Sequence, residues 1–586
     1  GRGVGCRKNV CQRSFVSGGL RWRHDRVGDV SVKPWMRWRE GCRGPETRMS
    51  SSAIRGEVDS LGGDEFRFGL TRWTEGVRGD LARRVPLYVS DWKEGLTLKS
   101  IPAVMFLYFA CLAPVIAFGG LTATLTGGAI GLVEFLVSAS VAGMAYAAFS
   151  GQPLTLIGPT GLTLAFTTAL YSFCGRYGLP FLPMYSWVGL WTGAILFFLV
   201  IFNASDMIRY CTRFTDDVFN SLIATNFLYE ASRSLASGFK SSGSDKTKPF
   251  MALSLALGTY ILGRSLAEFR RTRFLRRSVR EFFADFGPTI AITAMSALSL
   301  LPSVRQISLE TLAVPSTFQL ANGRAWLVPL SAVAMPYRFL AIVPAILLTC
   351  LFFLDQNISV RVVNSPSHAL KKPAAYHLDL LILSLVTVIC SLFGLPWMCA
   401  ATVQSLNHVR ALSTTRSVTG NDGTKKEQIT VVETRLTGFL IHLSIGVSLL
   451  LLPVIKLIPM AVISGLFLYL GRNIMTGNEF LRRIRLFFVD PELYPEGSPM
   501  TKIRSGKVHL FTLVQLLCLG LLWTLKVNKR TSLFFPSVIG TLMVIRSYIL
   551  PSFFAEKELA VLDSDIESEA IEEINGDQLM ARDNGL

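Results

Sequence analysis

The chain has 586 residues, is 50% hydrophobic and only 17% charged, and has a mean hydropathy of +0.41. Soluble domains carry about 25% charged residues, so this composition excludes a string of soluble domains and predicts an all-α polytopic membrane protein. The net charge of +18 would also fit a nucleic-acid-binding protein. The distribution of charge over loops, described below, is the simpler explanation, and no nucleic-acid partner is predicted.

The first 98 residues are predicted to be a basic, disordered region on the cytoplasmic side. Residues 1–50 contain ten Arg and two Lys against four acids, and no apolar run. A disordered tail, a transit peptide and translated sequence upstream of Met49 all fit, although the acids argue against the transit peptide. Residues 552–586 hold ten acids against two basic residues and are predicted to form an acidic cytoplasmic tail.

About fourteen apolar segments lie between residues 99 and 551, the predicted transmembrane transporter domain. Several are shorter than the roughly 20 residues that a helix needs to cross a bilayer. Their approximate bounds are 101–118, 130–149, 154–172, 187–203, 215–231, 251–264, 282–301, 339–359, 376–393, 397–408, 434–453, 458–471, 508–525 and 533–550.

The third and the tenth segments are interrupted by glycine and proline. They read GQPLTLIGPTGLTLAF from Gly151 and GLPWMCAATVQS from Gly394. Because they lie seven segments apart, they predict two inverted repeats of seven helices, with the binding site where the broken helices meet. Pro396 lacks a backbone donor, so a half-helix is expected to start near Trp397 or Met398 and to present free N–H groups to an anion.

Positive charges gather in the loops that follow even-numbered segments. The loop after the sixth segment carries seven arginines between residues 264 and 280, whereas the loops after the first and the ninth carry no charge. By the positive-inside rule, both termini are predicted to be cytoplasmic. The predicted membrane is the plasma membrane, with an organelle envelope, such as that of a plastid, as the alternative.

The eighth segment carries one acid, Asp355, and an ionised carboxylate in a bilayer costs about 2.5–3.5 kcal/mol on insertion scales. Such an acid indicates an ion pathway, in which it binds Na⁺ or takes up a proton. Ser359 lies four residues later and therefore on the same helix face. The structural alternative is that Asp355 lies at the cytoplasmic end of the helix, solvated or paired with Arg361.

The sequence gives no sign of enzyme chemistry. Its ten cysteines are scattered without a CxxC pair or metal-ligand spacing, and there is no P-loop, HExxH or GxSxG motif. We therefore predict neither an enzyme nor a cofactor, and small buried side chains as the role of the cysteines.

Five long stretches resemble the bicarbonate transporters of solute carrier family 4, which include anion exchangers, sodium bicarbonate cotransporters and borate exporters. The resemblance covers about 90–550 in order. The stretches are FLYFACLAPVIAFGG (Phe106–Gly120), GQPLTLIGPTG (Gly151–Gly161), KKPAAYHLDLL (Lys371–Leu381), FGLPWMCAATVQSLNH (Phe393–His408) and VHLFTLVQLLCLGLLWTLK (Val508–Lys526).

This resemblance implies fourteen helices in two inverted halves, a core and a gate domain, half-helices at segments three and ten, and a homodimer formed through the gate. It also implies elevator-like movement of the core. The substrate would lie between the third and tenth helices, beside the acid of the eighth. The corresponding positions are Thr160, Gly161, Asp355, Ala400, Ala401, Thr402, Val403 and Gln404.

Two of these positions bear on the transported ions. Chloride/bicarbonate exchangers of the family typically have Glu on helix eight and Arg on helix ten, where this chain has Asp355 and Gln404. The resemblance therefore favours sodium-coupled transport of bicarbonate or carbonate, with Na⁺ bound by Asp355, Ser359 and Thr402. Sodium-coupled members usually have an apolar residue at position 404, so the match is incomplete. A borate exporter and a chloride/bicarbonate exchanger are the alternatives.

Overall fold

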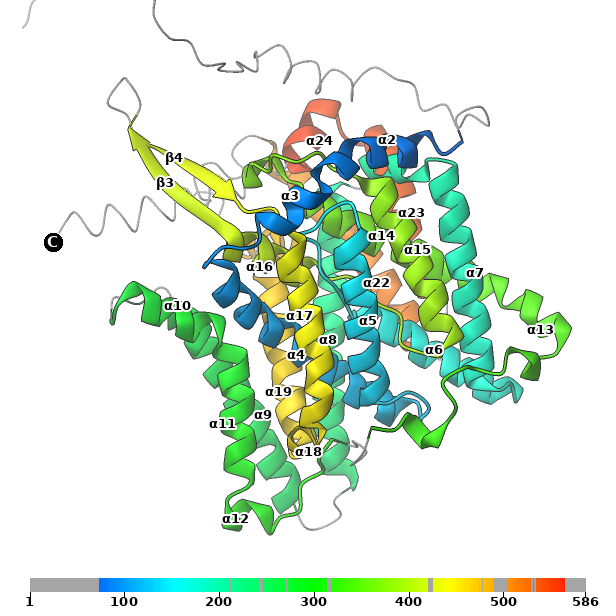
Figure 1. The fold of residues 1–586 in the computed structure, drawn as a ribbon, viewed down its shortest axis with the longest axis vertical. Coiled ribbons are helices and arrows are strands. Elements are labelled where there is room, and N and C mark those ends of the chain that lie inside the picture. The colour runs from blue at the N-terminus through cyan, green and yellow to red at the C-terminus, as the bar shows by residue number, and fades with distance from the viewer. Residues whose placement is uncertain are drawn as a thin grey trace, which may run out of the picture. The chain divides into compact units, whose positions relative to one another are not determined.

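The computed structural model describes residues 73–563, with gaps inside that range. The gaps are residues 211, 242–245, 270, 271, 273, 313–317, 420–424, 477, 490–502, 529, 530, 532 and 533. The described part is predominantly α-helical (Figure 1). Most of the predicted basic N-terminal region and most of the acidic tail lie outside the described residues.

The long helices form two groups that pack mainly within themselves. The first bundle consists of α4 (Ser100–Leu125), α5 (Leu132–Phe149), α6 (Gly161–Tyr177), α7 (Phe181–Ile201), α14 (Ile342–Val363), α15 (Tyr376–Leu392), α16 (Thr402–Leu412) and α17 (Arg435–Val447). In this bundle α15 and α14 pack along α7, and α17 packs along α5. Buried Leu107, Leu136 and Leu383 belong to its apolar core.

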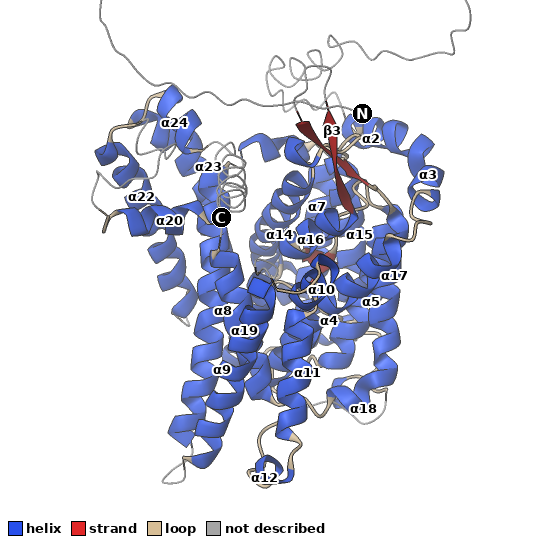
Figure 2. Cartoon of the chain, turned by 90° about the vertical axis from the view of Figure 1, so that its left-hand side faces the viewer, coloured by secondary structure: helices blue, strands red, loops and turns tan. Residues whose placement is uncertain are grey.

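The second bundle consists of α8 (Arg213–Ser241), α9 (Thr247–Glu268), α11 (Gly287–Ser299), α19 (Met460–Met475), α22 (Ser505–Val527) and α23 (Phe535–Val544). Helix α19 packs against both α8 and α9, and α11 packs along α9 (Figures 1 and 2). The bundles meet where α14 contacts α23 and where α4 contacts α11 and α19.

Shorter elements connect the long helices. The short helices are α2 (Glu75–Arg84), α3 (Tyr88–Lys93), α10 (Arg277–Asp285), α12 (Pro302–Arg305), α13 (Met335–Leu340), α18 (Leu452–Ile455), α20 (Glu479–Leu486) and α24 (Glu556–Leu562). The 3₁₀-helices are η1 (Val85–Leu87), η2 (Ala204–Tyr210), η4 (Ala321–Gly323), η5 (Leu330–Ala332), η6 (Pro366–His368), η7 (Ser448–Leu451) and η10 (Leu550–Ser552). One π-helical turn, η9, spans Ile545–Ile549. Because α2 and α3 are helices, the expectation of disorder is wrong for residues 75–84 and 88–93.

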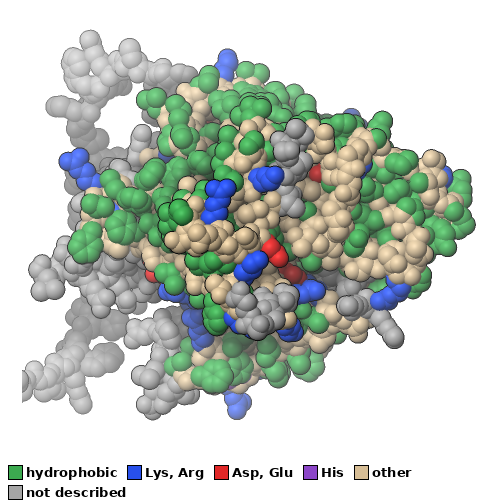
Figure 3. Space-filling model, turned by 90° about the horizontal axis from the view of Figure 1, so that it is seen from below, with side chains coloured by type: hydrophobic (Ala, Val, Ile, Leu, Met, Phe, Trp, Pro, Cys, Tyr) green, Lys and Arg blue, Asp and Glu red, His purple; other side chains and the backbone are tan. Residues whose placement is uncertain are grey.

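Two ends of the helix bundles can be told apart. Helices α2 and α3 and the antiparallel hairpin of β3 (Ser413–Thr419) and β4 (Lys425–Val431) lie at one end, which we call the near face (Figures 1 and 2). Helices α12 and α18 lie at the opposite end, the far face. Viewed from this far face, the surface is mainly hydrophobic or uncharged, with scattered Lys and Arg (Figure 3).

Seven helices among the described residues are long and apolar enough to cross a membrane. They are Ser100–Leu125, Leu132–Phe149, Phe181–Ile201, Thr247–Glu268, Met335–Val363, Arg435–Ile455 and Ser505–Val527. A helix also occupies part of each of the other predicted segments. Large apolar side chains on α9, such as Phe250 and Ile261, are exposed, as expected for a helix that faces lipid. The chain is therefore a multi-pass integral membrane protein.

The two interrupted segments come together in space. Strand β1 (Ile157–Gly158) pairs with β2 (Cys399–Ala400) in an antiparallel ladder, and the Ala401 N–H donates to the Leu156 carbonyl at 2.8 Å. This pairing keeps the chain before α16 extended. The predicted helix start near Trp397 or Met398 is therefore wrong, because α16 begins only at Thr402.

Candidate functional site

A cavity of about 90 Å³ lies where the interrupted segments face the second bundle. All eight residues predicted from the sequence to bind the substrate line it. They are Thr160 and Gly161 at the start of α6, Asp355 on α14, and Ala400, Ala401, Thr402, Val403 and Gln404 at the start of α16. A cavity of this size has room for several water molecules, and thus for a small ion with part of its hydration shell.

Asp355 is the one carboxylate among the described residues that line the cavity. It is only 3% exposed, and its Oδ2 atom has no hydrogen-bond partner among the described residues. Arg361 forms its ion pair with Asp216, not with Asp355. The structural alternative, a solvated or Arg361-paired Asp355, is therefore wrong, and a buried carboxylate oxygen remains available for a ligand.

Ser359 lies one helical turn after Asp355 on α14, and its hydroxyl meets that of Thr402 at the start of α16. The Ser359 and Thr402 hydroxyls share a hydrogen bond at 2.6 Å, and Ser359 also donates to the Ala400 carbonyl at 3.4 Å. Ser359 is fully buried and does not line the cavity, so it reaches the site through Thr402. Carboxylate, hydroxyl and carbonyl oxygens are the ligands that hard cations prefer. Among the described residues, no cluster of three His, Cys, Asp or Glu suggests another metal.

The two helix starts at the cavity differ in how they are capped. Thr160 precedes α6, and its hydroxyl accepts from the Thr163 N–H at 3.4 Å. Ala401 precedes α16 and has no side-chain oxygen to accept from the first N–H groups of that helix. Uncapped N–H groups at a helix start bind anions. The start of α16 therefore lacks a side-chain cap and lines the same cavity as Asp355.

The chain before β2 is held in place by buried contacts. The Tyr185 ring stacks on Trp397 with centroids 3.7 Å apart, and its hydroxyl accepts from the Trp397 N–H at 3.2 Å. Ser138 donates to the Pro396 carbonyl at 2.5 Å. Gly394 has a φ of +59°, a conformation that favours glycine. The interrupted segment is thus a rigid support for the α16 start.

Sequence reasoning missed the opposite wall of the cavity. This wall consists of Pro114 and Phe118 on α4, Asn220, Ile223 and Phe227 on α8, and Leu470, Asn473 and Ile474 on α19. None of these helices is broken by an extended stretch with glycine and proline, which was the pattern that identified the third and tenth segments. The available signals were Asn220, inside the fifth predicted segment, and Asn473, two residues after the end of the twelfth.

Comparison with known proteins gives the family. The family described as "HCO3- transporter integral membrane domain" matches residues 72–248 and 240–567. The chain is 32% identical to the sodium-driven chloride bicarbonate exchanger of Homo sapiens over 88% of this chain and 52% of that protein. It is 33% identical to anion exchange protein 3 of Danio rerio over 89% of this chain and 46% of that protein. The chain thus spans about half the length of the curated relatives it matches.

Among solved structures, murine Solute Carrier 26 family member A9 in the inward-facing state matches with a TM-score of 0.55. The two share 11% sequence identity over 88% of this chain and 77% of that chain. This likeness concerns the fold alone. The family match spans nearly all the described residues, so the chain belongs to the bicarbonate transporter family, whose members are membrane transporters and not enzymes.

Proposed function

We propose that this protein moves bicarbonate or carbonate across a membrane as a sodium-coupled symport. One observation carries the proposal: the Asp355 carboxylate, whose Oδ2 atom has no hydrogen-bond partner among the described residues, lines the same cavity as the start of α16, which has no side-chain cap. Na⁺ held by Asp355, Ser359 and Thr402 would offset the charge of Asp355 beside the anion held at Ala400–Gln404 and near Thr160 and Gly161. The names of the relatives support this pairing of ions.

The charge of the cavity wall explains why sodium would be required. No Lys or Arg occurs among the described residues that line it. Without a fixed cation, an anion in this buried site lacks a countercharge, and burying an uncompensated charge is unfavourable. A bound Na⁺ would cancel the negative charge of ionised Asp355, which would otherwise repel the anion in the same cavity, so the two ions would bind together.

The position of the cavity favours alternating access. In the proposed mechanism the first bundle is the core, which carries the substrate and moves like an elevator against the second bundle, the gate. Two inverted repeats of seven helices, with α6 and α16 as half-helices, would place the site at the centre of the membrane. Residues 99–551 would form this transporter domain, dimerising through the gate. The basic region before it and the acidic tail at 552–586 would lie in the cytoplasm, at the plasma membrane or a plastid envelope.

Flux measurements test the proposed function. Purified protein in proteoliposomes should take up ¹⁴C-bicarbonate in the presence of an inward Na⁺ gradient and about tenfold less without Na⁺, the ratio expected from loss of one ionic contact of about 1.4 kcal/mol. Uptake that is independent of Na⁺ but requires chloride on the opposite side of the membrane would identify the protein as a chloride/bicarbonate exchanger. Transport of borate in place of bicarbonate would make it a borate exporter.

Replacing Gln404 by Arg should reduce the need for sodium. The guanidinium would provide the missing countercharge at the start of α16, so bicarbonate uptake without Na⁺ should rise by about tenfold. Gln404→Leu is the matched control, because it changes the same side chain without adding charge and should keep the sodium dependence. If Gln404→Arg transports normally and stays fully dependent on Na⁺, the countercharge argument is wrong.

A further inference from the structure

An ion pair joins the two helix bundles beside the substrate cavity. Its members are Arg361, in the last turn of α14 in the first bundle, and Asp216, in the first turn of α8 in the second. The Arg361 guanidinium donates to the Asp216 carboxylate, and the two side chains are only 27% and 14% exposed. The pair therefore connects the two bodies that the proposed function moves against each other.

The two helices that carry the pair place it close to the cavity. On α14, Asp355 lines the cavity and Arg361 lies six residues later, about 9 Å along the helix axis. On α8, Asn220 lines the cavity and Asp216 lies four residues earlier, about 6 Å along the axis. The ion pair is thus at the same end of the cavity on both helices.

Neighbouring contacts identify that end as the near-face side. The chain after α14 reaches Lys372, which bonds Asp91 on the near-face helix α3 at 2.7 Å. At the start of α8, the Phe214 N–H donates to Asp563 at 2.7 Å. Asp563 directly follows α24, which lies at the same end of the bundles as α2 (Figures 1 and 2). The ion pair therefore lies between the cavity and the near face.

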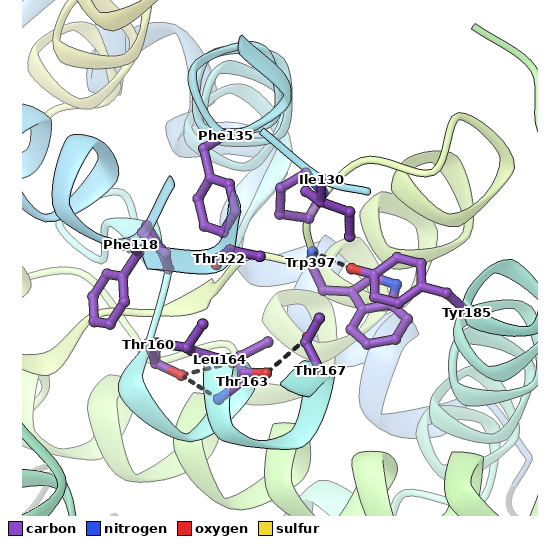
Figure 4. A pocket seen from close by; sticks show the side chains of 12 residues that line it. Phe118, Thr122, Ile130, Phe135, Thr160, Thr163, Leu164, Thr167, Tyr185 and Trp397 are labelled. Carbon is purple, nitrogen blue, oxygen red and sulfur yellow. Dashed lines mark hydrogen bonds between the residues drawn. The ribbon is translucent and has the colours of Figure 1, made fainter. Parts of the chain in front are cut away.

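Arg361 is fixed to the first bundle by dense packing. Figure 4 shows Phe118 from α4, Tyr185 from α7 and Trp397 from the interrupted segment around one small pocket. The volume of this pocket is about 10 Å³, room for about one water molecule, so these elements have little space to shift against one another. Phe352 on α14 makes an edge-to-face contact with Trp397, with centroids 6.4 Å apart. Helix α14 therefore moves with its bundle.

The first turn of α8 is fixed to the second bundle by buried polar contacts. Asp217, next to Asp216, accepts from Arg483 on α20 at 3.3 Å, and Arg483 also donates to Gln515 on α22 at 2.9 Å. The Asn478 side chain donates to the Asp217 carbonyl at 3.0 Å. Because these partners are all buried, Asp216 has a fixed place in its own bundle.

The ion pair consequently depends on the relative position of the two bundles. Its nitrogen and oxygen atoms must lie within about 4 Å of each other, whereas a shift by one helical turn is about 5.4 Å. We propose that the Arg361–Asp216 pair is a latch that stabilises the arrangement in Figure 1, and that each transport cycle breaks and re-forms it. A contact made in one of two conformations shifts the population toward that conformation. The inference rests on the proposed function.

Locking the pair covalently tests whether it must break. In Asp216→Cys/Arg361→Cys, a short bifunctional methanethiosulfonate should join the two thiols, and ¹⁴C-bicarbonate uptake should then fall at least tenfold and recover when the links are reduced. The matched control is Lys507→Cys/Glu558→Cys, whose native side chains form an ion pair at 2.6 Å between α22 and α24. Joining this pair leaves the bundles free to move and should preserve uptake.

Two results of the locking experiment have different consequences. Linked Asp216→Cys/Arg361→Cys protein that transports as fast as the same unlinked protein would overturn the latch. Wild type without bicarbonate uptake refutes the proposed function instead.

Removing one charge tests the stabilisation independently of transport. Arg361→Gln should shift the equilibrium between bundle arrangements about fivefold away from the one in Figure 1, as for loss of a partly exposed ion pair. Spin labels at Phe198→Cys on α7 and Ile261→Cys on α9, two exposed positions, would measure the distance between the bundles. Lys507→Gln should leave the distances unchanged. Identical distance distributions in wild type and Arg361→Gln would contradict the proposal.

Discussion

Replacing Asp355 by Asn should abolish the sodium dependence of bicarbonate uptake and lower uptake in saturating Na⁺ by roughly 10- to 100-fold, the range expected for losing a charged hydrogen-bonding ligand. The substitution keeps the shape of the side chain and removes the one carboxylate among the described residues of the cavity wall. Without this carboxylate, Na⁺ loses its one charged ligand among the described residues and no longer binds beside the anion. Initial rates of ¹⁴C-bicarbonate uptake over a range of Na⁺ concentrations would measure the effect.

Measuring the stability of the Asp355→Asn variant would distinguish a functional role of Asp355 from a structural one. Asp355 is buried with an unpartnered oxygen, so neutralising it should leave the protein as stable as before or more stable. Asp355→Glu is the matched control: it keeps the charge and should retain sodium dependence with a changed Na⁺ affinity. Normal sodium coupling in Asp355→Asn would remove Asp355 from the proposed sodium site.

Some features of the site could be predicted from the sequence because each has a local cause. Asp355 stands alone in a long apolar segment, where a charge is costly enough to need an explanation. The glycines and prolines around Pro159 and Pro396 cannot continue a regular helix, so the two interruptions were visible. These local signals located the acid and the two interruptions, and the family resemblance supplied the eight positions that line the cavity.

Other features depend on contacts between distant residues. The start of α16 is shifted to Thr402 because Cys399 and Ala400 pair with β1, some 240 residues earlier in the chain. Tyr185 supports Trp397 from an uninterrupted apolar helix, and nothing in its sequence neighbourhood distinguishes it. Packing of this kind is decided by tertiary structure, which local sequence patterns do not encode.

The helices before the first span make a buried ionic network that was also not visible from the sequence. Asp91 on α3 is fully buried and bonds Arg435 at 2.9 Å and Lys372 at 2.7 Å, with Arg84 at 3.6 Å. Arg435 also donates to the Ser150 carbonyl at 2.6 Å, just before the first interrupted segment. The Asp91 carboxylate on α3 thus connects to α2 through Arg84, to the chain before α15 through Lys372, and to α17 through Arg435. Arg435 extends the connection to the chain before α6.

Replacing Asp91 by Asn should therefore destabilise the protein by about 3–5 kcal/mol, because it leaves several buried cations without a counterion. Glu94→Gln is the matched control: Glu94 also binds Lys372, at 2.8 Å, but its side chain is 47% exposed. Solvent screens such a pair, so its loss should cost less than about 1 kcal/mol. Thermal unfolding of the purified variants in detergent, followed by tryptophan fluorescence, would compare their melting temperatures.

Equal shifts of the melting temperature in the two variants would contradict the network's role. A lower melting temperature for Asp91→Asn, with sodium dependence kept in the folded fraction, would assign Asp91 to the fold and leave Asp355 as the carboxylate that couples the ions.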